Sequence, residues 1–177
     1  MLADAFKCCG CNKEVTKYDI EDQDSATATL SQIQEAFQKQ ETADYPLTSK
    51  KPAFRKFRHN LNTFVEALIS ALSDKGHLVA DSHLLDNLNI WIATMSSSTL
   101  RQFRHTSTVV ALDMVSHLAE VAAEIRRTNG TTNRQLEAEN KKAQLNDARI
   151  QALTEKLAQG EEKREAVESV IKDLFDT

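Results

Sequence analysis

Apolar residues recur at intervals of three and four along most of the chain, which is the spacing of amphipathic α-helices. Leu30, Ile33 and Phe37 predict one such helix over about residues 25–39. A longer apolar stripe predicts a second helix over about residues 53–73. The stripe comprises Phe54, Phe57, Leu61, Phe64, Val65, Leu68 and Leu72.

The middle of the chain predicts two more helices. Ser82 is expected to cap one that reaches about Met95, and a longer helix begins at Thr99. The stripe of this longer helix is Leu100, Phe103, Val110, Met114, Leu118, Val121 and Ile125, with a weaker second set of Val109 and Leu112. A helix that is apolar on two sides packs between neighbours, as in a stacked solenoid.

Residues 131–159 contain strong helix formers but few apolar positions, which indicates a helix that projects into solvent. Gly160 is expected to turn the chain, and residues 161–175 to return antiparallel. Asn129-Gly130 either breaks the preceding helix or is spanned by it, and both alternatives stay open. The pattern therefore predicts a projecting helical hairpin.

The predicted fold is all-α, the start of a helical-repeat solenoid with a long projecting hairpin. We assign N-terminal helices and a connector to residues 1–52, a helical core to residues 53–130, and the hairpin to residues 131–177. Residues 2–9 resemble the last turns of a helix, and the chain stops just after an apolar pair. We therefore expect a fragment of a longer chain.

Composition narrows the functional classes. With 41% apolar and 27% charged residues, four Gly and two Pro, the chain favours helices. Its short apolar runs predict neither a membrane span nor a secretory signal, so we expect an intracellular protein. Cys8, Cys9 and Cys11 lack zinc-site spacing and fit a helix end stopped by Gly10. No catalytic motif occurs, so we expect neither an enzyme nor a cofactor.

The net charge of −4 hides a basic cluster in the stretch KKPAFRKFRHN at residues 50–60, which contains no acidic residue. Its cations could contact phosphates and release counterions from a duplex, or they could be solvated at a helix N-terminus. Cations at that end oppose the helix dipole, which weakens the second interpretation. The residues alone leave the two interpretations balanced. The cations are Lys50, Lys51, Arg55, Lys56 and Arg58.

A second basic group begins the helix from Thr99. Arg104 lies near the apolar stripe, and we expect it to form a partly buried ion pair with Asp81 or Asp86. His105 lies far from the stripe. We assign Arg104 and His105 structural roles rather than ligand contacts.

Four stretches occur in an order that resembles the N-terminal part of the cohesin SA subunit, the STAG or stromal antigen family. They cover nearly the whole chain, and KEVTKYDIEDQD suggests a fungal member. The stretches are FKCCGCNKEVT (6–16), DYPLTSKKPAFRKFRHNL (44–61), LRQFRHTSTVVALDMVSHL (100–118) and NRQLEAENKK (133–142).

This resemblance implies a HEAT-repeat solenoid in the nuclear ring complex that holds sister chromatids together and supports chromosome segregation. It implies binding of double-stranded DNA without sequence preference, and of the kleisin subunit mainly through repeats downstream of this chain. The basic pair of the family matches Arg55-Lys56, with Arg58 beside it, whereas the linker with Lys50 and Lys51 varies within the family.

Our hypothesis is a non-enzymatic cohesin regulatory fragment whose helix 53–73 lies along the duplex backbone, outside the major groove. The alternative is a protein scaffold whose hairpin docks a cohesin loader or another ring subunit, with no membrane contact. Acidic neighbours favour a solvated face for the lysines near residue 141. The residues expected to help the basic cluster from a distance are Arg101, Arg126, Arg127, Lys141 and Lys142.

Overall fold

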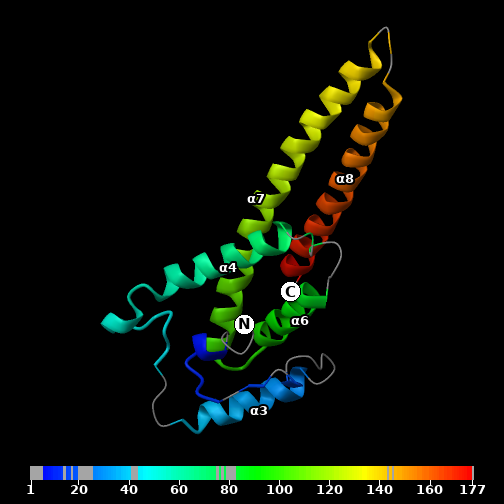
Figure 1. Cartoon of the computed structure of the whole chain (residues 1–177). Helices are drawn as coiled ribbons and strands as arrows, with labels where there is room; N and C mark the ends of the chain where they lie inside the picture. Colours follow the sequence, from blue (N-terminus) through cyan, green and yellow to red (C-terminus); the bar gives the residue numbers. More distant parts are fainter. Residues whose placement is uncertain are drawn as a thin grey trace.

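The computed structural model describes residues 6–13, 15, 16, 18, 19, 26–40, 44–74, 76, 78, 83–142, 144 and 146–176. Across these residues the chain forms helices and turns and no strand, so the prediction of an all-α fold is confirmed (Figure 1). None of the described helices is long and apolar enough to cross a membrane. The helices are α3 (Ala26–Gln38), the 3-10 turn η2 (Pro52–Phe54), α4 (Phe57–Asp74), α6 (His83–Ser96), α7 (Arg101–Asn140) and α8 (Asp147–Phe175).

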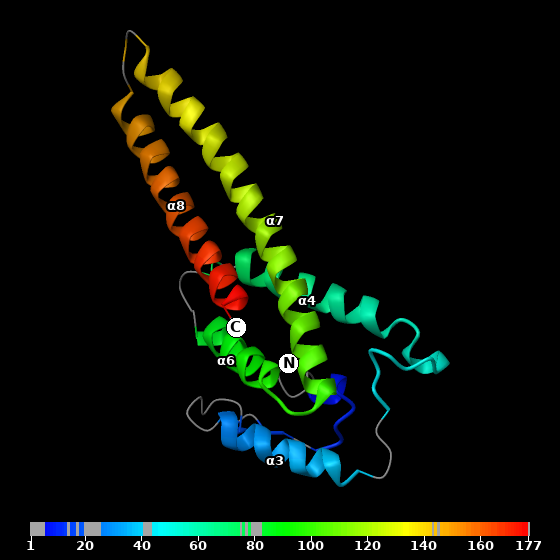
Figure 2. The same cartoon turned by 180° about the vertical axis from the view of Figure 1, so that it is seen from behind.

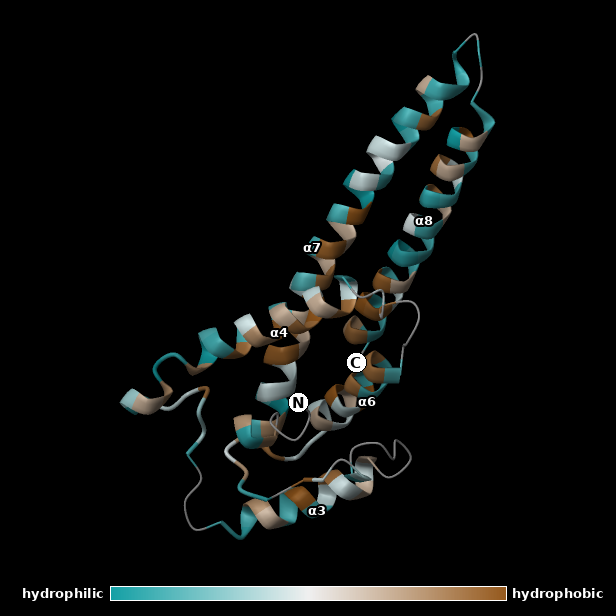
Figure 3. Cartoon of the chain, in the orientation of Figure 1, coloured by the Kyte–Doolittle hydropathy of each residue, from teal (hydrophilic) through white to brown (hydrophobic). Residues whose placement is uncertain are grey.

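The core lies where α6 and the first half of α7 meet, with α3 beneath them and α4 across α7 (Figures 1 and 3). Its centre is aromatic: the ring of Phe6 meets that of Trp91 edge-on at 5.4 Å, and Phe37 meets Phe103 at 5.5 Å. Such pairs add stabilisation beyond the burial of their area. The predicted apolar face of α3 is confirmed, since Leu30, Ile33 and Phe37 are all buried.

The predicted helix 53–73 begins later than expected. Pro52 opens a single 3-10 turn, in which the amide of Phe54 donates to the carbonyl of Lys51 at 3.0 Å. A turn at residues 55 and 56 then separates η2 from α4. The predicted stripe is also only partly covered, because α4 packs mainly on α7: Val65 is buried, whereas Phe64 is 48% exposed.

The structure decides between the alternatives left open at Asn129-Gly130 and differs from the prediction at Gly160. α7 continues through Asn129-Gly130, and α8 continues through Gly160, so the expected turn at Gly160 is wrong. The chain reverses instead between Asn140 and Asp147, where the side chain of Asn146 accepts from the Arg149 amide at 3.0 Å. At Gly160 the two helices approach closely, since a Cβ there would clash with the side-chain amide of Asn129.

The predicted boundary at residue 130 therefore falls inside a continuous helix. The hairpin projects away from the core in both views, yet the far end of α8 returns to it (Figures 1 and 2). Val167 and Leu174 of α8 are buried in the same apolar cluster as Leu118. Core and hairpin thus share both long helices.

The second apolar set of α7 is only half covered. Val109 is buried, but Leu112 is 54% exposed. Packing of α7 between neighbours on two sides is therefore incomplete in this chain. The predicted cap Ser82 lies outside the described residues.

Candidate nucleic-acid interface

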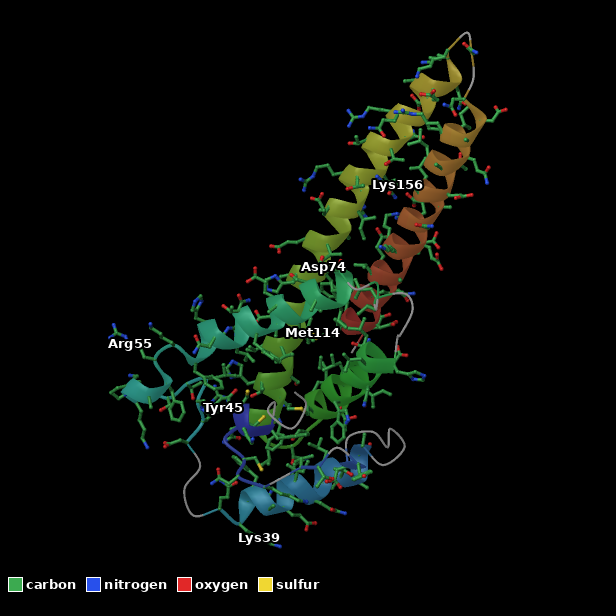
Figure 4. The ribbon with its side chains drawn as sticks, viewed as in Figure 1. Lys39, Tyr45, Arg55, Asp74, Met114 and Lys156 are labelled. Atoms are coloured by element: carbon green, nitrogen blue, oxygen red, sulfur yellow. The ribbon has the colours of Figure 1, made fainter. Side chains whose placement is uncertain are left out.

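The connector that carries the basic cluster is fastened to α7 by Tyr45. The Tyr45 hydroxyl lies 2.8 Å from Nδ1 of His105 and 3.2 Å from the hydroxyl of Thr106. Burial raises the pKa of Tyr45, so the phenol stays protonated and can donate. Residues 50–74, which comprise the end of the connector, η2 and α4, form a protruding arm. Figure 4 shows Tyr45 near the core and Arg55 at the protruding end of this arm. His105 therefore makes a structural contact.

The N-terminal loop supports the connector from a second side. Gly10 has φ 84, and a Cβ there would clash with the carbonyl oxygen of Asp44. Cys9 and Cys11 are buried beside it, and burial raises the pKa of Cys9 to about 12. No group of His, Cys, Asp or Glu that could hold a metal occurs among the described residues.

Two cations of the basic cluster are engaged by acids. Lys51 forms an ion pair with Asp44 at the start of the connector. Arg58 donates from Nη2 to Oδ1 of Asp113 at 3.0 Å, and Asp113 is only 6% exposed. These two pairs hold the connector in shape and fix the first turn of α4 to α7.

The other three cations of the cluster remain available. Lys50, Arg55 and Lys56 are exposed, and none of them forms an ion pair with any acid in the described part of the chain. In Figure 4 Arg55 stands at the protruding end of the η2–α4 arm, away from the core. The fold therefore presents a local positive charge on a chain whose net charge is −4.

Comparison with known families places this region in a known domain. The model of the STAG domain matches residues 43–156, from the connector to the first third of α8. The chain belongs to the STAG domain family. The resemblance to the cohesin SA subunits is thereby confirmed.

Relatives of this STAG chain are named as cohesin subunits. The cohesin subunit psc3 of Schizosaccharomyces pombe is 38% identical over 172 residues, which cover 97% of this chain and 18% of that protein. The cohesin subunit scc-3 of Caenorhabditis elegans is 34% identical over 96% of this chain and 15% of its own length. The chain thus spans less than a fifth of these relatives.

A solved structure shares the fold. The cohesin subunit Scc3 from Z. rouxii matches with a TM-score of 0.88 at 20% identity, over 97% of this chain and 20% of the other. The helical arrangement of the STAG chain is therefore that of a known cohesin subunit.

The residues expected to help from a distance do not form one surface with the cluster. Several cations on the long helices already have acidic partners: Arg126 pairs with Glu168 at 2.6 Å, Arg127 with Glu124 at 2.6 Å, and Lys142 with Glu139 at 2.7 Å.

Arg101 and Lys141 are exposed, and neither forms an ion pair with a described residue. They stand at opposite ends of α7, whose 40 residues span about 60 Å at 1.5 Å per residue. Only Arg101 lies near the connector, where its charge acts on Tyr45.

Arg104 does not form the ion pair that was expected with Asp86, so that prediction is wrong. Asp81, the other expected partner, lies outside the described residues. The guanidinium instead donates from Nη1 to the carbonyls of Ser98 and Thr99, at 2.7 and 2.9 Å. The chain reverses between α6 and α7 here, so these carbonyls have no helical donor. Arg104 is structural, but through the backbone.

Sequence reasoning missed the residues that position the basic cluster. Asp113 carried a signal, since it is a lone acid between Leu112 and Met114 in the apolar half of α7. An acid there needs a cationic partner, and Arg58 was the basic residue closest to the apolar stripe of α4. Tyr45 and Asp44 carried no comparable signal because they lie in a connector without periodicity.

Proposed function

We propose that this chain is the DNA-contacting part of a cohesin regulatory subunit and binds duplex DNA without sequence preference. The observation that carries the proposal is the exposure of Lys50, Arg55 and Lys56 on a protruding arm, without acidic partners in the described structure. The names of the relatives supply the cohesin context.

The mechanism is contact with phosphates. Each Lys or Arg that meets a phosphate releases condensed counterions, which gives affinity without reading bases. The positive end of the α4 dipole points toward the same place, since η2 and the three cations precede Phe57. This arrangement is unfavourable for the isolated helix and becomes favourable once an anion is bound.

The wider role follows from the same context. A subunit of this kind acts without catalysis, on nuclear chromatin, in sister chromatid cohesion and chromosome segregation. We propose that the kleisin subunit is held mainly by repeats that lie beyond this chain. The DNA contact would then be one of several that hold the complex on chromosomes.

The test is a charge reversal on the arm. In Arg55→Glu/Lys56→Glu we expect weaker binding to every duplex sequence, and a plot of log affinity against log salt that is flatter by about 1.8, at roughly 0.9 per lost contact. The control Lys156→Glu/Lys163→Glu makes the same charge change on exposed positions of α8. A folded arm variant with unchanged affinity and slope would sink the proposal.

A second candidate is a protein scaffold that docks a cohesin loader or ring subunit. An apolar groove of about 360 Å³ between α4, α6 and α7 favours it, with Phe64 and Leu61 on one wall and Trp91 on another. If the chain is such a scaffold, we expect Arg55→Glu/Lys56→Glu to bind DNA with wild-type affinity. We expect Phe64→Glu to lose a protein partner that copurifies with the wild-type chain.

A further inference from the structure

Three cations of the basic cluster line one side of a hollow that phosphate contact alone does not explain. A space of about 560 Å³ opens between the connector and η2, separate from the groove above. Cations and apolar side chains share its lining. The lining includes Ser49, Lys50, Pro52, Phe54, Arg55 and Arg58. Its volume is in the range of small-ligand sites, about 300–1,000 Å³.

The apolar part of the lining is fixed in place. The ring of Phe54 packs edge-on against that of Phe57, with 6.2 Å between centroids and an interplanar angle of 85°. Pro52 has a locked φ and begins the same 3-10 turn. Phe54 is only partly buried and lies outside the main apolar core, so its free surface faces the hollow.

One cation of the lining, Arg58, is also oriented. Asp113 holds Nη2 of Arg58, and the guanidinium has further N–H donors. Ser49 adds a hydroxyl, which accepts weakly from the Lys51 amide at 3.3 Å and can donate to an anion. The hollow thus combines positive donors with a rigid apolar surface, a chemistry that suits a group with an anionic part and an apolar part.

We propose that this hollow takes one sugar–phosphate unit of the DNA backbone, with the phosphate against Lys50, Arg55 and Arg58 and the deoxyribose against Phe54 and Pro52. This inference rests on the proposed DNA-binding function and adds Phe54 as a binding residue. The contact with deoxyribose would also distinguish DNA from a polyanion without sugars, because such a polyanion would bind only the cations.

The experiment compares duplex DNA with inorganic polyphosphate. In Phe54→Ala we expect duplex affinity to fall about three- to tenfold through lost apolar contact, with the salt slope unchanged. Polyphosphate affinity should stay at the wild-type value. The matched control is Phe64→Ala, which removes an exposed aromatic of the same arm that lines the other groove, and it should change neither affinity.

Equal weakening toward both ligands would overturn the inference, since Phe54 would then act only by placing the cations. Unchanged duplex affinity in Phe54→Ala would overturn it as well. If that variant does not fold, Pro52→Ala makes the same test at an exposed position, with a smaller expected loss toward duplex alone. Failure of the DNA function itself is distinct, because Arg55→Glu/Lys56→Glu would then leave duplex affinity intact.

Discussion

Arg104 binds two backbone carbonyls rather than a carboxylate, and its neighbours in the stretch FRHTST (103–108) are held by packing. Phe103 and Thr106 of this stretch are fully buried, and Ser107 is 2% exposed. The carbonyl of Arg104 accepts from the hydroxyl of Ser107 at 2.8 Å. Packing and backbone contacts thus account for the motif without a ligand.

Loss of Arg104 should lower stability modestly. Arg104→Ala removes two charge-assisted hydrogen bonds to carbonyls in a largely exposed position, so we expect a loss of about 1–2 kcal/mol in the free energy of unfolding. Urea denaturation measures it. Arg101→Ala is the control, since Arg101 is exposed at the same end of α7 and should cost under about 0.5 kcal/mol. Equal losses would contradict this role.

The buried thiols should be inert. Cys9 is fully buried with its pKa raised to about 12, and Cys11 is 1% exposed. Thiolates are the reactive form, so at pH 8 we expect a thiol reagent to modify neither residue until the chain unfolds. Mass spectrometry of the labelled protein measures this modification.

The fold should not depend on zinc. A chelator should leave the helical circular dichroism unchanged, and one zinc per chain by elemental analysis would refute that expectation.

At the scale of elements, the contact between Asn129 and Gly160 sets how α7 and α8 pair. Asn129 is 9% exposed and donates to Oε1 of Glu161 at 2.9 Å. The missing Cβ of Gly160 makes room for that side chain. A glycine in a helix can therefore mark a close approach of two helices rather than an end.

The two helical glycines should respond in opposite ways to alanine. At Gly130 no atom lies within 4 Å of an added Cβ, so Gly130→Ala should stabilise by up to about 1 kcal/mol through helix propensity. Gly160→Ala should destabilise, because the new methyl displaces the buried amide of Asn129. Thermal unfolding compares them. Asn129→Ala should turn the effect of Gly160→Ala favourable, and stabilisation by Gly160→Ala alone would refute the contact.

The hairpin should weaken in acid. Hydrogen bonds from Arg164 and Asn129 lower the pKa of Glu161, and one from Arg126 lowers that of Glu168, from an ordinary 4.5. Their stabilisation is complete above pH 4.5 and is lost as pH falls through the lowered values. We expect the urea midpoint to drop over that window. Glu161→Gln/Glu168→Gln should flatten the drop, and an identical acid profile would contradict the assignment.

Periodicity predicted the helices whose whole apolar face is buried, such as α3, because burial there follows local spacing. It failed where a contact outside the helix itself decides. Arg104 binds carbonyls of the turn that precedes α7, and the side chain that fills the space at Gly160 of α8 is Asn129 of α7. The basic cluster could be predicted from the sequence because its five cations are close together in the chain. Which of them form ion pairs could not, because Asp44 and Asp113 meet Lys51 and Arg58 only in the folded chain.

At the scale of the whole molecule, the arm cations Lys50, Arg55 and Lys56 lie far from Lys141, which follows the last residue of α7. The end of the η2–α4 arm and the far end of the hairpin are widely separated in both views (Figures 1 and 2). The arm alone is proposed as the DNA contact, so the footprint should be short.

Duplex length tests this footprint. If arm and hairpin gripped one duplex, affinity would rise steeply once the duplex was long enough to reach both. The length of α7 alone, about 60 Å, corresponds to about 18 base pairs at 3.4 Å each. We expect no such step between 14 and 30 base pairs after correction for overlapping positions. Fluorescence anisotropy measures it, and Lys141→Glu should leave the 30-base-pair affinity unchanged within about twofold. A steep gain with length would place the hairpin on DNA.

Because α7 is one continuous helix, a small rotation at its base displaces the far end of the hairpin by a larger distance. The base of α7 packs among α4, α6 and the end of α8. In Figures 1 and 2 its far half runs beside α8 and no other described helix. A tilt of about 5° near Leu118 carries Asn140, about 33 Å further along the helix, sideways by about 3 Å. Small rearrangements around Met114 and Leu118 are thereby magnified at the far end, where a fluorophore pair between hairpin and arm would register them.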